Sequence, residues 1–116
     1  MTKFEELNTI VSKFLKVLSD PTRLKMISYL KDNPSTASEI QEKLDLSQSY
    51  TSHQLKRLVE VGIIESNREG RIKNFKIKEK SIFKLISILK SYVIKLEKLK
   101  LNQLNSLEVT DFEEFF

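Results

Sequence analysis

Residues 36–58, TASEIQEKLDLSQSYTSHQLKRL, decide the fold of this chain. The segment opens with Thr36 three residues before Glu39, which is the spacing of a capping box at the start of a helix. Ile40 and Leu44 follow four residues apart, so they share one face of that helix and predict its buried side. The first half of the segment therefore predicts a short helix that ends near Leu44.

The second half predicts another helix after a short turn. Asp45, Leu46 and Ser47 form the turn, and Ser47 is a favourable N-cap for the helix that follows. The inward-facing positions of this second helix are Thr51, Leu55 and Leu58. Gly62 is expected to end the helix, because glycine readily adopts the left-handed conformation that follows many helices. Two helices joined in this way are typical of a helix-turn-helix unit.

Two further helices are predicted before this unit. Residues 3–18 carry apolar side chains at helical spacing, at Phe4, Leu7, Val11, Phe14 and Leu18. Asp20 and Pro21 then start a new helix, because aspartate is a good cap and proline suits the first helical position. That helix ends near Asn33-Pro34, since proline interrupts a helix. Its buried face is expected to contain Leu24, Met26, Ile27 and Leu30.

After the helix-turn-helix unit the apolar period changes from that of a helix to that of a strand. Segments 63–67 and 72–77 flank Arg68-Glu-Gly-Arg71, which predicts a two-stranded hairpin with Glu69-Gly70 at its tip. Residues 79–105 return to helical spacing, with an apolar stripe at Ile82, Leu85, Leu89, Tyr92, Leu96 and Leu99. The predicted fold is mainly α with a small β-hairpin, a winged helix-turn-helix with long N- and C-terminal helices.

The second helix of the helix-turn-helix unit presents a polar outer surface suited to reading DNA. Its outward positions, together with the cap, are Ser47, Gln48, Ser49, Ser52, His53 and Lys56. Glutamine can bond adenine bidentately, serine can bond several bases, and lysine can reach guanine or phosphate. A solvated helix face has the same composition, but its place directly after the turn favours DNA reading.

The predicted hairpin is basic and lies next to that helix in the chain. A basic hairpin in this position is suited to hold the sugar-phosphate backbone, and we expect Arg68, Arg71 and Lys73 to do so. Lys76 and Lys78 are equally well explained as strand lysines that deter edge-to-edge aggregation.

Three stretches, in this order, resemble the ArsR/SmtB (arsenic-repressor) family of winged-helix regulators. They are LSDPTRL at 18–24, LSQSYTSHQLKRL at 46–58 followed by VGII at 61–64, and REGR at 68–71. The resemblance implies a homodimer that binds an operator and usually represses. It maps the family's DNA-reading positions onto Gln48, Ser49, Ser52, His53, Lys56, Arg68 and Arg71.

Many members of that family sense metals through a cysteine pair in the third helix or through histidine and carboxylate ligands in the last helix. This chain contains no cysteine and one histidine, His53, which lies on the predicted reading helix. Borderline metal ions need imidazole or thiolate ligands, so neither a metal site nor a cofactor is expected. An enzyme is not expected either, because no nucleophile–base–acid set can be assembled around His53.

The composition adds the domain organisation and the compartment. The chain is 40% hydrophobic and 31% charged, the balance of a globular domain rather than a disordered one. Residues 108–116, EVTDFEEFF, hold four acidic residues and no basic one, so the preceding chain is more basic than the overall charge of +4. We expect one DNA-binding and dimerisation domain, residues 1–107, and an acidic aromatic tail, residues 108–116. Without a signal peptide or a membrane-spanning run, the expected compartment is the cytoplasm.

These features predict a homodimeric, metal-independent transcriptional regulator, most simply a repressor, that binds a palindromic operator in double-stranded DNA. Dimerisation is assigned to the first and last helices, at Phe4, Leu7, Val11, Phe14, Ile82, Leu85, Leu89, Tyr92 and Leu96. One alternative is a winged helix used for protein–protein contact, with only non-specific affinity for DNA. Another is a regulator that also binds a small apolar effector between the first and last helices.

Overall fold

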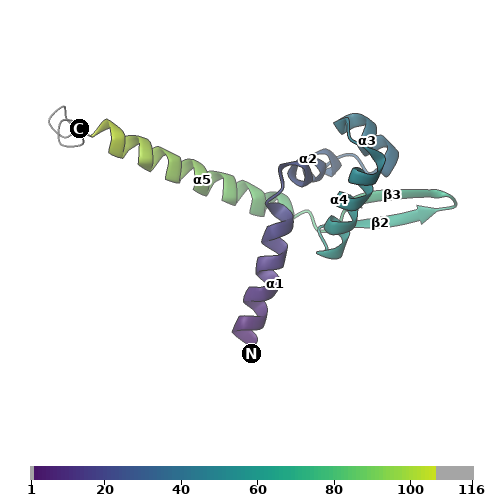
Figure 1. The fold of residues 1–116 in the computed structure, drawn as a ribbon, viewed down its shortest axis with the longest axis horizontal. Coiled ribbons are helices and arrows are strands. Elements are labelled where there is room, and N and C mark those ends of the chain that lie inside the picture. The colour runs from purple at the N-terminus through teal and green to yellow at the C-terminus, as the bar shows by residue number, and fades with distance from the viewer. Residues whose placement is uncertain (1, 107–116) are drawn as a thin grey trace. The chain divides into compact units, whose positions relative to one another are not determined.

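The computed structural model describes residues 2–106, which form helices and a small sheet. The elements in chain order are α1 (Lys3–Leu18), α2 (Pro21–Leu30), β1 (Ser35–Thr36), α3 (Ala37–Leu44), α4 (Gln48–Glu60), β2 (Ile64–Glu69), β3 (Ile72–Ile77) and α5 (Ile82–Asn105). The helix-turn-helix unit is α3 and α4, and the wing is the β2–β3 hairpin (Figure 1). The predicted winged helix-turn-helix fold is confirmed. None of the described helices is long and apolar enough to cross a membrane.

Four helices begin at capping residues that the chain supplies locally. Thr2, Asp20, Thr36 and Ser47 each accept a hydrogen bond from the backbone N–H three residues later, at distances between 3.0 and 3.3 Å. The Thr2 cap is reciprocal, because the Glu5 carboxylate accepts from the Thr2 backbone N–H at 2.8 Å. Each cap satisfies an N–H group that has no partner inside its helix.

The sheet contains three antiparallel strands in the order β1-β3-β2, one strand more than predicted. Ser35 of β1 lies opposite Phe75, and Thr36 lies opposite Asn74. Two residues are too few to show an alternating pattern, and Thr36 also serves as the N-cap of α3. The local sequence around β1 therefore signals only the helix.

The hairpin turns one residue later than predicted. Glu69 pairs with Ile72, so the loop is Gly70-Arg71 and not Glu69-Gly70. Gly70 has φ +62, and Arg71 is not among the residues with positive φ. Positive φ at the first loop position alone is the pattern of a type II′ turn. Arg68, which was predicted to lie in the connection between the two strands, lies within β2.

The core of the winged-helix unit lies between its helices and the sheet. The buried apolar residues there are Val17, Leu18, Met26, Ile27, Leu30, Ile40, Leu55, Leu58, Ile63, Ile64 and Phe75. Three of the four residues predicted to be buried on α2 are in this set, whereas Leu24 is only half-buried. Helix α1 enters the core only through its last turn, at Val17 and Leu18.

The chain separates into two units, residues 1–80 and a second that begins at Ser81 and contains α5. Helix α5 starts at Ile82 and not near Glu79 as predicted. The backbone N–H of Lys78 donates to the carbonyl of Ile63 at 3.1 Å, which holds the chain against the sheet beyond β3 and delays the helix. The predicted tail, residues 108–116, lies outside the described residues, so the predicted domain boundary stays a prediction.

Candidate nucleic-acid interface

The turn between α3 and α4 sets where α4, the helix predicted to read DNA, begins. The N–H of Leu46 donates to the carbonyl of Gln41 at 3.0 Å, which closes the end of α3. Asp45 has φ +54, a left-handed conformation that aspartate tolerates better than most residues with a side chain. The chain then reaches Ser47, whose Oγ accepts from the N–H of Tyr50 at 3.3 Å and caps α4.

The inner face of α4 is anchored in the core. Thr51, Leu55 and Leu58 are at most 1% exposed, as the apolar period predicts. The Thr51 hydroxyl donates to the Ser47 carbonyl at 2.8 Å, so this buried polar group is satisfied within its own helix. Because these side chains are fully packed, the rotation of α4 about its axis is determined by the core.

That rotation exposes the polar side chains predicted to read DNA. Gln48, Ser49, Ser52, His53 and Lys56 are all exposed, and their spacing of three and four residues places them on one face. The first turn of α4 contains no acidic side chain, so nothing on this turn neutralises the partial positive charge of the helix N-terminus. The face offers amide, hydroxyl, imidazole and ammonium groups for base edges and phosphates.

His53 is oriented by a neighbour that the sequence analysis did not include. The Nε of Arg57 donates to Nε2 of His53 at 3.1 Å, one helical turn away. Since Nε2 accepts this bond, the neutral imidazole carries its proton on Nδ1 and can donate it to a ligand acceptor. The sequence does contain a signal for this contact, because residues four apart on a helix lie next to each other on its surface.

A second missed feature is the network of Arg23, which joins three helices. Its guanidinium donates to the carbonyl of Val17 at 2.6 Å and to the carbonyl of Lys16 at 3.1 Å, both in the last turn of α1. It also donates to Oε1 of Gln54, on the inner side of α4, at 2.6 Å. Gln54 is 4% exposed, so Arg23 pairs a buried amide that would otherwise lack this donor.

The wing places two of its predicted DNA contacts on the face that covers the core. Side chains alternate between the faces of a strand, and the register sets Arg68 opposite Lys73 and Ser66 opposite Phe75. Phe75 is buried, so all four residues lie on the side of the sheet that packs on the helices. Like charges directly opposite each other destabilise a hairpin.

The remaining wing bases fall into two groups. Arg71 lies in the hairpin loop and is exposed. Lys76 lies on the opposite face of β3, where its Nζ is 3.5 Å from the Glu65 carboxylate. Arg71 is therefore available to a polyanion, whereas Lys76 is partly neutralised on the face away from the helices.

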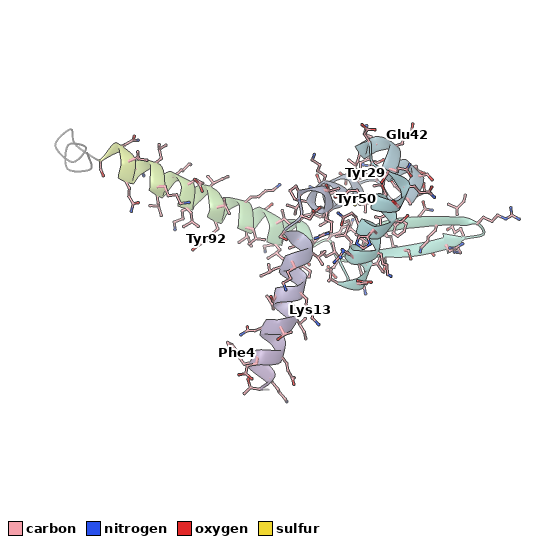
Figure 2. The ribbon with its side chains drawn as sticks, in the orientation of Figure 1. Phe4, Lys13, Tyr29, Glu42, Tyr50 and Tyr92 are labelled. Atoms are coloured by element: carbon pink, nitrogen blue, oxygen red, sulfur yellow. The ribbon has the colours of Figure 1, made fainter. Side chains whose placement is uncertain are left out.

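The residues predicted for dimerisation form apolar surfaces on α1 and α5. Those with exposed fractions between 39% and 72% are Phe4, Leu7, Val11, Leu85, Leu89, Tyr92 and Leu96. Phe14 is half-buried and Ile82 is 8% exposed, so these two are less accessible than the other residues predicted for dimerisation. In Figure 2, Phe4 and Tyr92 point outward from the helices that carry them.

Comparisons with known proteins agree with the winged helix-turn-helix fold described above. Residues 20–66 match the family model described as bacterial regulatory protein, arsR family. The cadmium resistance transcriptional regulatory protein CadC of Listeria innocua is 33% identical over 79 residues, which cover 67% of this chain and 66% of the relative. The chain thus spans just under two thirds of that relative's length.

Two further relatives extend the comparison. The biofilm growth-associated repressor of Agrobacterium fabrum is 33% identical over 85 residues, and the match covers 73% of each chain. The homodimeric winged helix-turn-helix DNA-binding domain of a possible ArsR-family regulator from Mycobacterium bovis superimposes with a TM-score of 0.73. That match is 19% identical and covers 82% of this chain and 88% of the domain, so it supports the fold alone.

Proposed function

Because the chain belongs to the ArsR family of bacterial regulatory proteins, we propose that it is a transcriptional repressor that binds a specific DNA operator as a homodimer. The family is one of regulators, so the chain is not an enzyme. The observation that carries the proposal is the exposed polar face of α4, held in rotation by a packed inner face. The proposed place of action is the cytoplasm.

In this proposal α4 reads bases and the wing holds phosphates. The base-reading residues are Gln48, Ser49, Ser52, His53 and Lys56, with Ser47 on a phosphate at the helix N-terminus. Arg68, Arg71 and Lys73 hold the adjacent backbone. Support comes from the exposure of every one of these side chains and from the Arg68–Lys73 cross-strand pair, which an anion would relieve.

The proposed dimer pairs α1 and α5 of one protomer with those of its partner. It is supported by the exposed apolar stripes on both helices, because transfer of such residues from water into an interface is favourable in free energy. Two-fold symmetry then presents two α4 helices to half-sites about one helical turn apart. A palindromic operator follows from that symmetry.

We further propose that DNA binding does not depend on a metal ion. Relatives include a cadmium resistance regulator, but this sequence contains no cysteine and a single histidine. Within residues 2–106, no three His, Cys, Asp or Glu side chains are grouped so that they could hold a metal ion. His53 already accepts a hydrogen bond from Arg57 and lies among the proposed DNA contacts.

The test is selection of bound fragments from the host's own genomic DNA, with a scrambled duplex as competitor. The expected result is enrichment of one palindromic sequence whose half-sites are about one helical turn apart. Binding that shows no sequence preference and disappears at moderate salt would contradict the proposal. That outcome would favour the alternative, a winged helix used for protein–protein contact.

A further inference from the structure

A groove lies between the reading helix and the wing. Its volume is about 560 Å³, and it runs from Ala37 of α3 along α4 to the helix-facing side of β2 and β3. Figure 1 shows α4 beside the β2–β3 hairpin, within the winged-helix unit. Pockets of about 300–1,000 Å³ are the size that holds a small organic molecule. The groove is therefore large enough for a ligand of its own.

The walls of the groove are amphipathic. Its apolar lining residues include Leu55, Val59 and Phe75, of which Val59 is the most accessible at 37% exposed, against 1% for Leu55 and 7% for Phe75. The lining also includes the basic residues Lys56 and Lys73. Such a surface suits a molecule with an apolar body and one charged end.

The two lysines are available to an anion. Among residues 2–106, neither Lys56 nor Lys73 forms an ion pair with a carboxylate, unlike Lys76, which pairs with Glu65. Lys73 Nζ lies 5.3 Å from the centre of the Phe75 ring, so its charge is held directly above the apolar surface. The hydroxyls of Ser52 and Ser66 line the same groove and can donate to an anion.

The net charge of the lining residues indicates how many negative charges a matching ligand carries. Two lysines are opposed by one carboxylate, that of Glu60, which leaves the lining with a single net positive charge. We propose that the groove binds a small amphipathic monocarboxylate, such as a medium-chain fatty acid or an arylalkanoic acid. The apolar body lies on Val59 and Phe75, and the carboxylate lies between Lys56 and Lys73.

Two other anions fit the groove less well. A phosphodiester carries its charge on a fully polar group and gains nothing from Val59 or Phe75. The acidic segment 108–116 of this chain contains four carboxylates, which would meet Glu60 inside a lining of one net positive charge. A monocarboxylate matches both the charge and the apolar surface.

The ligand would regulate DNA binding, and this consequence rests on the proposed function. Ser52, Lys56 and Lys73 line the groove and are also proposed DNA contacts. One set of groups cannot serve both partners at once, so the carboxylate and the operator compete. The ligand therefore acts as an inducer that releases the repressor.

The first experiment measures ligand binding alone, on the full chain without DNA. Octanoate is titrated into ¹⁵N-labelled protein, with octanamide as a neutral probe of the same shape. We expect saturable shifts of the amide signals of Leu55, Val59 and Phe75, and about tenfold weaker binding of octanamide. Val59→Trp fills the groove without changing its charge and should weaken octanoate binding by about tenfold or more.

Two further variants separate the groove from the general surface. Lys73→Gln should weaken octanoate more than octanamide, and it replaces Val59→Trp if the latter does not fold. Lys98→Gln removes an exposed lysine from α5 and is the matched control, which should bind octanoate like the wild type. Equal affinity for octanoate and octanamide, or no saturable shift in the groove, would overturn the proposal. Saturable shifts of the same signals with an added EVTDFEEFF peptide, and none with octanoate, would overturn it in favour of the chain's own tail.

The second experiment adds the operator. Octanoate should release operator DNA from the wild type and have no such effect on Val59→Trp. If the wild type binds octanoate in the groove but binds no DNA, the proposed function fails while the groove assignment stands. If it binds DNA that octanoate does not displace although the groove is filled, competition is wrong.

Discussion

The guanidinium of Arg23 shows how one side chain connects α1 to α4, the proposed reading helix. It satisfies two carbonyls in the last turn of α1, where a cation is also favoured by the helix dipole. Its third bond goes to the buried amide of Gln54 in α4. The side chain is half-buried, so these bonds are partly shielded from water. If α1 pairs with a second protomer, Arg23 links that interface to α4.

Arg23→Ala is expected to lower the free energy of unfolding by about 1–3 kcal/mol, because it leaves the Gln54 carbonyl oxygen buried without its donor. Urea unfolding measures the change, and Lys25→Ala on the exposed side of α2 is the control. Adding Gln54→Leu to Arg23→Ala should recover part of the loss, since no buried amide then remains. A loss no larger than that of Lys25→Ala would show that the network contributes little.

Gln48 and Arg71 should affect DNA binding in different ways. Gln48→Ala removes a base contact and is expected to weaken operator binding by roughly 1–3 kcal/mol with little effect on random DNA. Arg71→Ala removes a phosphate contact, so it should weaken both duplexes alike and lower the salt slope by about one unit. Titrations of both variants against operator and scrambled duplex at several salt concentrations distinguish these results. If Gln48→Ala weakens both duplexes equally, α4 is not the reader.

At the residue scale, the spacing of apolar residues predicts which side of a helix faces the core, and it predicts little else. The inward positions Thr51 and Leu55 follow from their spacing on α4, and the core covers them as expected. Gln54 lies on the same side, but a polar residue next to an apolar stripe gives no sign of burial. Its partner Arg23 is 31 positions away in the chain. A pair so far apart is created by the packing of α2 on α4 and leaves no local pattern.

At the element scale, helices were predicted better than strands because their ends are marked by caps. Helices α2 and α4 begin directly after Asp20 and Ser47, as the sequence predicts, since each cap acts on residues within one turn. The strand β1 and the late start of α5 both depend on pairing with distant backbone, as in the Lys78–Ile63 hydrogen bond. The loop was misplaced for a similar reason, because the Glu69–Ile72 pair moves it to Gly70-Arg71.

Basic side chains on the two faces of the wing are expected to differ in their effect on DNA binding. Arg68→Thr removes one of two like charges that lie opposite each other, so it should leave stability unchanged or raise it by about 0.2–1 kcal/mol. The same change should weaken DNA binding and lower its salt slope by about one unit. Lys76→Thr, on the opposite face, is the matched control and should leave DNA binding close to that of the wild type. Thermal melting and DNA titration of both variants test the assignment, which fails if the two behave alike.

At the scale of the whole molecule, the proposed metal independence gives a prediction, because the chain contains no cysteine and a single histidine. We expect zinc or cadmium ions at low micromolar concentration to change neither the melting temperature nor the operator affinity, because no three His, Cys, Asp or Glu side chains within residues 2–106 are grouped to hold a metal ion. Chelator-treated protein is the reference, and differential scanning fluorimetry with DNA titration measures both quantities. A stoichiometric shift that a chelator reverses would contradict metal independence.

Helices α1 and α5 both expose apolar stripes to solvent. The stripe of α5 remains 39–59% exposed at Leu85, Leu89, Tyr92 and Leu96, and α1 exposes Phe4 at 72%. Large apolar surfaces on soluble proteins commonly mark protein contacts. The homodimer proposed above explains both stripes with one partner, a second copy of the chain.

Leu89→Glu combined with Leu96→Glu tests this assignment. Two carboxylates inside the proposed interface would be desolvated without partners, so the variant should sediment as a monomer or unfold, and operator binding should be lost. Ser87→Glu with Lys98→Glu is the matched control, because helical periodicity places both positions on the opposite side of α5. The control should stay dimeric with unchanged circular dichroism. An intact dimer of the Leu89→Glu/Leu96→Glu variant in sedimentation velocity would show that this stripe of α5 does not form the interface, and α1 would then have to supply the interface without it.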